Sequence, residues 1–329
     1  VSASYYAGGL IGFVEPSASI EACSVSGDLR GSGIAIGGFA GVLGKAAKIT
    51  YSYADVALTA AVSCSNVGGF IGDTSGTRED PSFIRGCYAA GDVAGGSYTG
   101  GFTGTAAGFT IQNCYATGDV TGAAKAMASF AGTDAPAGWL YGTVQNCYTT
   151  GNVLGSTTYP GAFLPMSSAM RRSEFTNCYY INSDTNLAAL SRYEDEIKPA
   201  LPLSPEEMQT EAFADTLNAG EPANGWLFRA GETPLCGAEA ADYSAVDAAL
   251  ATIPAELTQY TDASAAAVTA AREKVVRGEI AARQSRVDDM AKAIADAVRG
   301  LTPRPSSSSS SSSSSGGSST PRYAVAVEE

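Results

Sequence analysis

The sequence predicts a mainly β protein: a stacked-coil β-solenoid of about six coils with a helix-strand cap, followed by a small three-helix bundle and a disordered serine-rich tail. Two short signatures alternate along residues 1–181, and each recurs six times at a spacing near 30 residues. Such a period, with β-prone pieces and glycine punctuation, is typical of coils that bury their apolar faces by stacking. From Asp242 onward the sequence becomes alanine-rich and charged, which predicts helices.

The first signature is a glycine pair followed by an apolar residue, a variable residue and a third glycine. It reads GGLIG, GGFAG, GGFIG and GGFTG, starting at Gly8, Gly37, Gly68 and Gly100. Degenerate copies start at Ala128 and Gly161. Successive starts are 29, 31, 32, 28 and 33 residues apart, which predicts one copy per coil.

The second signature is Cys-Tyr-x-x-Gly-Asp-Val. Clear copies start at Cys87, Cys114 and Cys147, and weaker ones at Cys23, Ser52 and Cys178. At about 4.8 Å per coil, six stacked copies predict a rod roughly 30 Å long.

A kink with positive φ is predicted just before the cysteine. Gly86, Asn113, Asn146 and Asn177 occupy this position, and glycine and asparagine tolerate φ > 0 best. Such a kink would reset the in/out alternation, so that residues on both sides of it face the core. The first two copies depart from the pattern, because they carry Ala22 and Tyr51.

The cysteines are expected to be reduced, buried residues that stack one per coil, since free cysteine is among the most buried residue types. None of the seven belongs to a C-x-x-C pair, and Ser52 replaces one of them. The alternative is a redox or metal ladder. Native-state thiol titration separates the two, because a buried ladder would resist the reagent.

The alternating GGLIG and NCYATGDV units resemble the GLUG repeat of bacterial surface adhesins and of immunoglobulin A peptidase stalks. The resemblance covers about 180 residues and implies a surface or stalk role. Those peptidases carry a HExxH zinc motif, which a chain without histidine cannot form.

Residues 182–238 are expected to cap the solenoid. Ser204-Pro205-Glu206-Glu207 is a helix start with a capping box, and the helix should run to about Leu217. Trp226-Leu227-Phe228 is then predicted to be a strand that covers the last coil, because the end coils of a solenoid are open edges.

Residues 239–302 show three amphipathic faces, which predict three helices. The phrases DYSAVDAAL, QYTDASAAAV and VDDMAKAIADAV resemble the FIVAR module of Gram-positive cell-wall proteins, which implies a spacer or a carbohydrate contact. In residues 303–329, ten consecutive serines (306–315) predict a flexible tether, since such a run cannot offset its ordering entropy.

The amino-acid composition excludes or disfavours several classes of function and of partner. The absence of histidine removes Ser-His-Asp and Cys-His catalysis and histidine-ligated zinc. A net charge of −13 disfavours nucleic-acid partners. No apolar run reaches the length of a membrane span. We expect no cofactor, no metal and no catalytic residue in what is predicted to be a monomeric segment of a longer, secreted protein.

Two outward columns are candidate ligand-binding features. Tyr88, Tyr115 and Tyr148 would form a stripe of exposed rings that docks glycans or proteins, or a cross-coil stack that stabilises the rod. Asp92 and Asp119 lie at one corner, where carboxylates could bind Ca²⁺ or act as an acid/base pair. Such residues more often hydrogen-bond turn backbone, and Asn152 in the next copy favours that role.

The resulting hypothesis is a non-catalytic adhesin or stalk segment of a bacterial cell wall that presents a binding face to glycans or host proteins. One alternative is a β-helix polysaccharide-active enzyme that uses paired carboxylates. Another is a passive accessory region of a larger surface enzyme.

Overall fold

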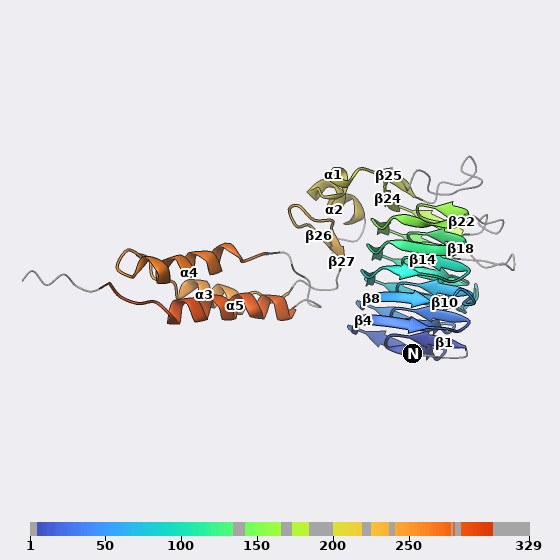
Figure 1. Cartoon of the computed structure of the whole chain (residues 1–329), viewed down its shortest axis with the longest axis horizontal. Helices are drawn as coiled ribbons and strands as arrows, with labels where there is room; N and C mark the ends of the chain where they lie inside the picture. Colours follow the sequence, from blue (N-terminus) through green and yellow to red (C-terminus); the bar gives the residue numbers. More distant parts are fainter. Residues whose placement is uncertain are drawn as a thin grey trace, which may run out of the picture.

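The computed structural model describes residues 5–133, 142–165, 173–183, 200–218, 225–236, 241–277, 279 and 284–304. Its first part is the predicted β-solenoid, a stack of parallel strands with about five complete turns, and helices follow (Figure 1). The predicted disordered tail falls almost entirely outside the described residues. No helix in the described ranges is both long and apolar enough to cross a membrane.

Three parallel sheets form the walls, and in each the same repeat position stacks on itself from coil to coil. The five-stranded sheet contains β19 (Ala131–Thr133), β15 (Thr103–Thr105), β10 (Ile71–Thr74), β6 (Ala40–Leu43) and β2 (Ile11–Val14). The six-stranded sheet contains β23 (Ser173–Thr176), β20 (Gly142–Gln145), β16 (Phe109–Gln112), β11 (Ser82–Arg85), β7 (Lys48–Thr50) and β3 (Ser19–Glu21).

The third sheet is wide, because its longest strands run through two neighbouring parts of the wall. Its main path is β1 (Tyr6–Gly8), β5 (Ala35–Gly37), β9 (Asn66–Gly68), β14 (Tyr98–Gly100), β18 (Val120–Ala128), β13 (Val93–Ala94), β8 (Tyr53–Ala60), β12 (Tyr88–Ala89), β17 (Tyr115–Ala116), β21 (Tyr148–Thr149), β24 (Tyr179–Ile181) and β25 (Leu201–Leu203). Beside this path, β22 (Val153–Gly161) pairs with β18, and β4 (Ser24–Gly31) pairs with β8.

A stack of phenylalanines runs through the core. Each of five consecutive coils supplies one ring from the first signature, and neighbouring ring centroids lie 4.5–5.1 Å apart. The stacked rings are buried and belong to Phe39, Phe70, Phe102, Phe130 and Phe163. The signature therefore places one large apolar side chain per coil at the centre of the rod.

The flanking glycines of the signature bring two walls together. A Cβ on Gly72 would lie 2.6 Å from the backbone nitrogen of Ile36, and one on Gly68 would lie 2.6 Å from the nitrogen of Gly104. Real Cβ atoms do not approach backbone this closely, so only glycine fits on either side of the corner. The pattern Gly-Gly-x-x-Gly is thus required by the close contact between strands such as β9 and β10.

The predicted kink is confirmed at every copy. Positive φ values occur at Gly86, Asn113, Asn146 and Asn177, and also at the two non-matching positions, Ala22 and Tyr51, with φ of 51° and 52°. Ile111 and Cys114, which flank the kink at Asn113, are both buried in the core. The asparagines also bond along the axis: Asn146 Nδ2 donates to Asn113 Oδ1 at 3.1 Å, and Asn177 Nδ2 donates to Asn146 Oδ1 at 2.9 Å.

The cysteines are free thiols, and all except Cys23 are buried. In five of the seven, the sulfur donates a hydrogen bond to the carbonyl oxygen two residues earlier, for example from Cys114 to Gln112 at 3.1 Å. Burial raises the pKa of the Cys114 and Cys178 thiols, so these two stay protonated. The arrangement fits the expected packing ladder.

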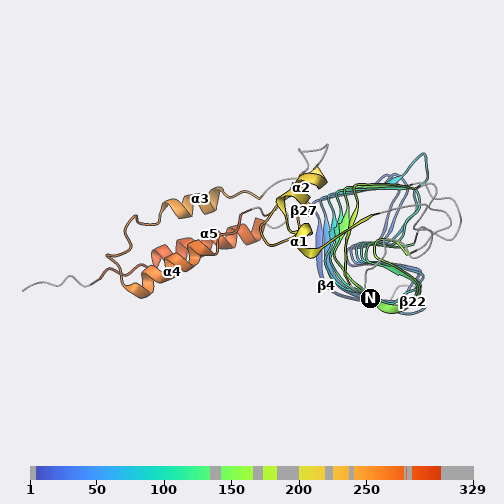
Figure 2. The same cartoon turned by 90° about the horizontal axis from the view of Figure 1, so that it is seen from above.

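The cap consists of α1 (Pro205–Met208), α2 (Glu211–Asn218) and the antiparallel pair β26 (Trp226–Leu227) and β27 (Leu235–Cys236). The capping box at Ser204 is present, but the expected single helix is broken after Met208. The expectation that the tryptophan strand covers the last coil is wrong. It lies against the side of the rod, because β25 already pairs with β24 at that end (Figure 2).

The predicted three helices are present as α3 (Ser244–Ala251), α4 (Asp262–Glu273) and α5 (Gln284–Arg299). Their common core is small, with Val246, Val287 and Ile294 buried at its centre. The apolar faces predicted from the sequence meet there, with Ala271, Val275 and Met290 packed around the centre. The boundaries proposed for the four segments of the chain stay predictions.

One carboxyl in the solenoid is held in an unfavourable place. Asp73 in β10 accepts a hydrogen bond from Asn66 Nδ2 at 3.0 Å, and burial raises its pKa to about 7. In the unfolded chain a carboxyl of this kind releases its proton near pH 4. Between about pH 4 and 7 the folded state therefore binds one proton more than the unfolded state. Stability falls as pH rises through this window.

Replacing Asp73 with asparagine removes the free-energy cost of ionising a buried carboxyl at this position. We expect Asp73→Asn to be more stable than the wild type above pH 7 by about 1–3 kcal/mol, because each tenfold change in proton affinity corresponds to about 1.4 kcal/mol. The advantage should shrink as the pH is lowered toward 4. Thermal melts from pH 4 to 8 would measure it, and a difference that does not vary with pH would contradict the prediction.

The corner between β9 and β10 should not tolerate an added methyl group. We expect Gly72→Ala to destabilise the solenoid by about 4 kcal/mol or more, because the backbone of a neighbouring strand must move. Gly12→Ala is the matched control, since the same repeat position in the first coil has no atom closer than 3.1 Å. Urea unfolding of the two variants should give clearly different midpoints, and equal midpoints would contradict the argument.

Candidate ligand groove

The side chains of the tyrosine column project from the face of the strands that is opposite to the face carrying the cysteines. Four of its rings, from Tyr53 to Tyr148, stack with centroids 4.7–5.0 Å apart. Of the two alternatives, the structure shows the cross-coil stack, and the exposed stripe is wrong, because Tyr88, Tyr115 and Tyr148 are only 4%, 2% and 0% exposed. The cap covers them, so they form a second apolar core outside the sheet.

Aromatic side chains of the cap make this cover. The ring of Trp226 lies 5.8 Å from that of Tyr115 and 5.3 Å from that of Tyr148, and Phe213 packs edge-on against Tyr148. The hydroxyl of Tyr148 donates to the backbone oxygen of Pro234 at 2.6 Å. The tyrosine column thus attaches the cap to the flank of the rod.

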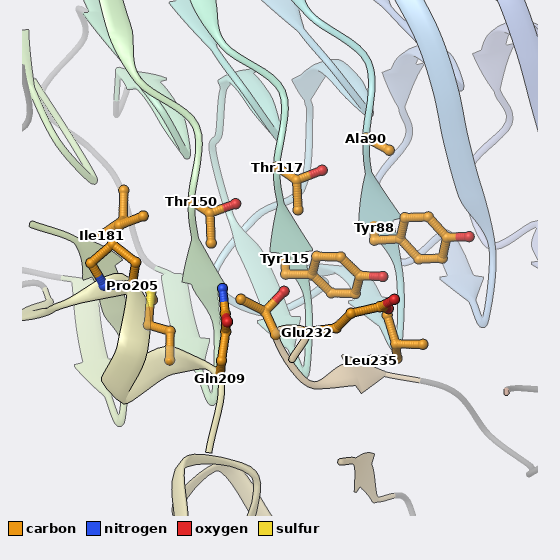
Figure 3. A pocket seen from close by; sticks show the side chains of 12 residues that line it. Tyr88, Ala90, Tyr115, Thr117, Thr150, Ile181, Pro205, Gln209, Glu232 and Leu235 are labelled. Atoms are coloured by element: carbon orange, nitrogen blue, oxygen red, sulfur yellow. The ribbon is translucent and has the colours of Figure 1, made fainter. Parts of the chain in front are cut away.

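The cap leaves a groove of about 330 Å³ along one margin, between the sheet and the cap. The sheet contributes the two tyrosines Tyr88 and Tyr115 and a second column that follows the tyrosines at a distance of two residues (Figure 3). That second column consists of Ala90, Thr117, Thr150 and Ile181. The opposite wall comes from α1 and from the turn before β27, and consists of Pro205, Met208, Gln209, Glu232, Thr233 and Leu235.

Strand geometry explains the second column. Residues i and i+2 of a strand lie on the same face, so Thr117 and Thr150 share the face of Tyr115 and Tyr148. Both threonines are half-buried, and in Figure 3 their hydroxyls lie above the tyrosine rings. Gln209, the C-cap residue of α1, faces them with its side-chain amide.

Glu232 is the only charged side chain among the described residues that line the groove. Its Oε2 lies 3.1 Å from Arg229 Nη1, and the same nitrogen lies 3.2 Å from Oε1 of Glu279. Glu279 is buried and lies between α4 and α5 in the sequence, so Arg229 joins the rim of the groove to the helical module. This ion pair fixes Glu232 at the rim.

The aspartate column does not reach the groove. Asp92 Oδ1 accepts a hydrogen bond from the backbone N–H of Asp119 at 2.9 Å, and Asp119 Oδ1 accepts one from the N–H of Asn152 at 2.8 Å. Each carboxylate thus ties its own turn to the turn of the next coil, rather than to its own backbone as expected. Ligand binding by Asp92 or Asp119 stays an untested prediction.

The structure brings together only part of the predicted set. Tyr88 and Tyr115 line the groove, whereas Tyr148 is buried under the cap and the two aspartates lie outside it. Sequence reasoning missed Thr117, Thr150, Gln209 and Glu232. The alternation of strands could have revealed the threonines, since both follow a column tyrosine by two residues.

The chemistry of the groove is that of hydrogen bonding beside apolar ring edges. Hydroxyl, amide and carboxylate groups line it, together with tyrosine edges and methyl groups on the sheet side and a methionine on the cap side. Within the described ranges, no group of three or more Cys, Asp or Glu side chains could hold a metal ion.

Comparison with known proteins identifies the repeat. Residues 95–121 match the GLUG motif, and this match supports a GLUG-repeat protein. The matched stretch begins at Gly95 and ends after β18 has begun, so it contains one copy of each signature. Neither the curated proteins nor the solved structures give a significant match.

The bond from Tyr148 to the cap can be tested by removing one oxygen. We expect Tyr148→Phe to lower the free energy of unfolding by about 1–2 kcal/mol, because the buried oxygen of Pro234 loses its donor. Tyr53→Phe is the matched control, since Tyr53 is a partly exposed ring of the same stack. Chemical denaturation would compare the two variants, and equal losses would show that the bond contributes nothing specific.

Proposed function

We propose that this chain is a non-catalytic segment of a bacterial cell-surface protein, a stiff stalk that binds glycans in the groove between solenoid and cap. The groove carries the proposal, since it is a preformed concave site with apolar and hydrogen-bonding groups side by side. The GLUG motif and the rod-like fold support the surface or stalk role.

A sugar fits this lining better than an apolar ligand does. Pyranose rings present C–H faces and hydroxyls together, and the groove offers ring edges and methyl groups beside Thr117, Thr150 and Gln209. Each hydroxyl or amide can both donate and accept, which suits polyols. The tyrosine faces are covered by neighbouring rings, so recognition here uses hydrogen bonds and ring edges rather than stacking.

The alternative of a polysaccharide-active enzyme with paired carboxylates receives less support. The two aspartates that would form the pair each accept a hydrogen bond from the backbone of the next coil. Glu232 in the groove has no second carboxylate among the described lining residues. These contacts favour a binding role over acid/base chemistry.

Blocking the groove tests the proposal. The full chain is probed on an array of glycans and host-matrix proteins, and Thr117→Trp is compared with it, because the indole would fill the groove from a half-exposed position. We expect glycan binding by the wild type and at least a tenfold loss in Thr117→Trp. Thr110→Trp, on the half-exposed outer side of β16 in the same coil, serves as the matched control and should bind normally.

Two outcomes would contradict the proposal. Binding that is equal in the wild type and in Thr117→Trp would place the ligand elsewhere on the chain. Absence of binding to every glycan on the array would favour the passive stalk or accessory region.

A further inference from the structure

We infer that the groove takes an uncharged, linear, equatorially linked glycan, laid along the axis of the rod with one sugar unit for each coil-to-coil interval. The inference rests on the proposed function and names its ligand class and binding mode. Four successive coils contribute one residue each to the second column of the groove, namely Ala90, Thr117, Thr150 and Ile181. The site is therefore a one-dimensional array with the period of the solenoid.

The period of the array sets the spacing of the ligand. The tyrosine rings beneath the groove repeat at 4.9 and 5.0 Å, which is the distance from coil to coil. A pyranose unit in an extended, equatorially linked chain advances by nearly the same distance. Successive units, although each is turned over relative to the one before, can therefore keep the spacing of the coils, with the hydroxyls of Thr117 and Thr150 on either side of the central unit.

The length of the array limits the number of units. From Ala90 to Ile181 the column crosses three coil-to-coil intervals, or roughly 15 Å. The two end positions are apolar, whereas the two central positions carry hydroxyls. Hydrogen bonding is thus concentrated in the centre, and a trisaccharide fills the site.

The charge of the groove selects against acidic sugars. Glu232 lies on the cap side, and in Figure 3 its side chain passes below Tyr115 toward Leu235, at the Tyr88 end of the array. Its carboxylate can accept hydrogen bonds from sugar hydroxyls. A uronic acid at the same place would put a second carboxylate beside it, and like charges at such a distance repel. Arg229 offsets this repulsion only in part, because its guanidinium is shared between Glu232 and the buried Glu279, which also lies 3.7 Å from Arg286.

Calorimetry with defined oligosaccharides and the full chain tests the inference. The probes are N-acetylglucosamine oligomers of one to four β(1→4)-linked units, maltotriose as a bent trimer, and a β(1→4)-linked trimer of mannuronic acid as an anionic one that keeps the equatorial linkage. We expect affinity to rise up to three units and then level off, and to be at least tenfold weaker for both other trimers. Thr150→Val should weaken trimer binding about fivefold, the loss of one hydrogen bond, while Thr110→Val should not.

The outcomes separate this inference from the proposed function. If maltotriose or the mannuronic acid trimer binds as tightly as the linear trimer, and Thr117→Trp abolishes that binding, the groove is a glycan site but the inferred class is wrong. Affinity that is independent of oligomer length, or unchanged in Thr150→Val, would overturn the axial mode. If no glycan on the array or in the calorimeter binds, the proposed function itself fails.

Discussion

The close approach of two walls at the glycine corner is the constraint on which the rest of the structure depends. Gly68 and Gly72 have no room for a Cβ, so β9 and β10 meet almost backbone to backbone. This contact turns the chain sharply around each stacked phenylalanine and fixes where the next strand starts. Because every coil repeats it, neighbouring coils share one register, and every other column in the rod follows from that register.

One consequence of the common register is that a single strand serves two cores. In β17, Cys114 just before the strand packs into the rod, while Tyr115 packs outward against the cap. The left-handed asparagine at 113 makes the inward turn possible without disturbing the strand that follows. The outer apolar face is buried by the cap. The groove exists because the cap does not extend over the column that contains Thr117 and Thr150.

The sequence predicts the solenoid well and the candidate site only in part. The fold can be predicted because it repeats, so that one local pattern, such as asparagine before cysteine, occurs in several coils. The rule is even obeyed at Ala22 and Tyr51, where stacking on the next coil imposes a φ that the residue itself would not choose. The groove depends instead on long-range contacts between the cap and the tyrosine column, such as those of Trp226 and Phe213, which no period in the sequence reveals. For this reason the exposure predicted for the tyrosines is wrong.

Because the cap lies on the side of the rod, the length of the rod and the composition of the groove are determined by different coils. The groove draws only on the coils that contain Tyr88 and the later copies of its column, whereas the coils before Tyr53 contribute nothing to it. Coils added or deleted among those first copies would change how far the segment extends and leave the groove intact. Repeat number can thus vary freely during evolution on one side of the cap while the residues beneath it remain fixed.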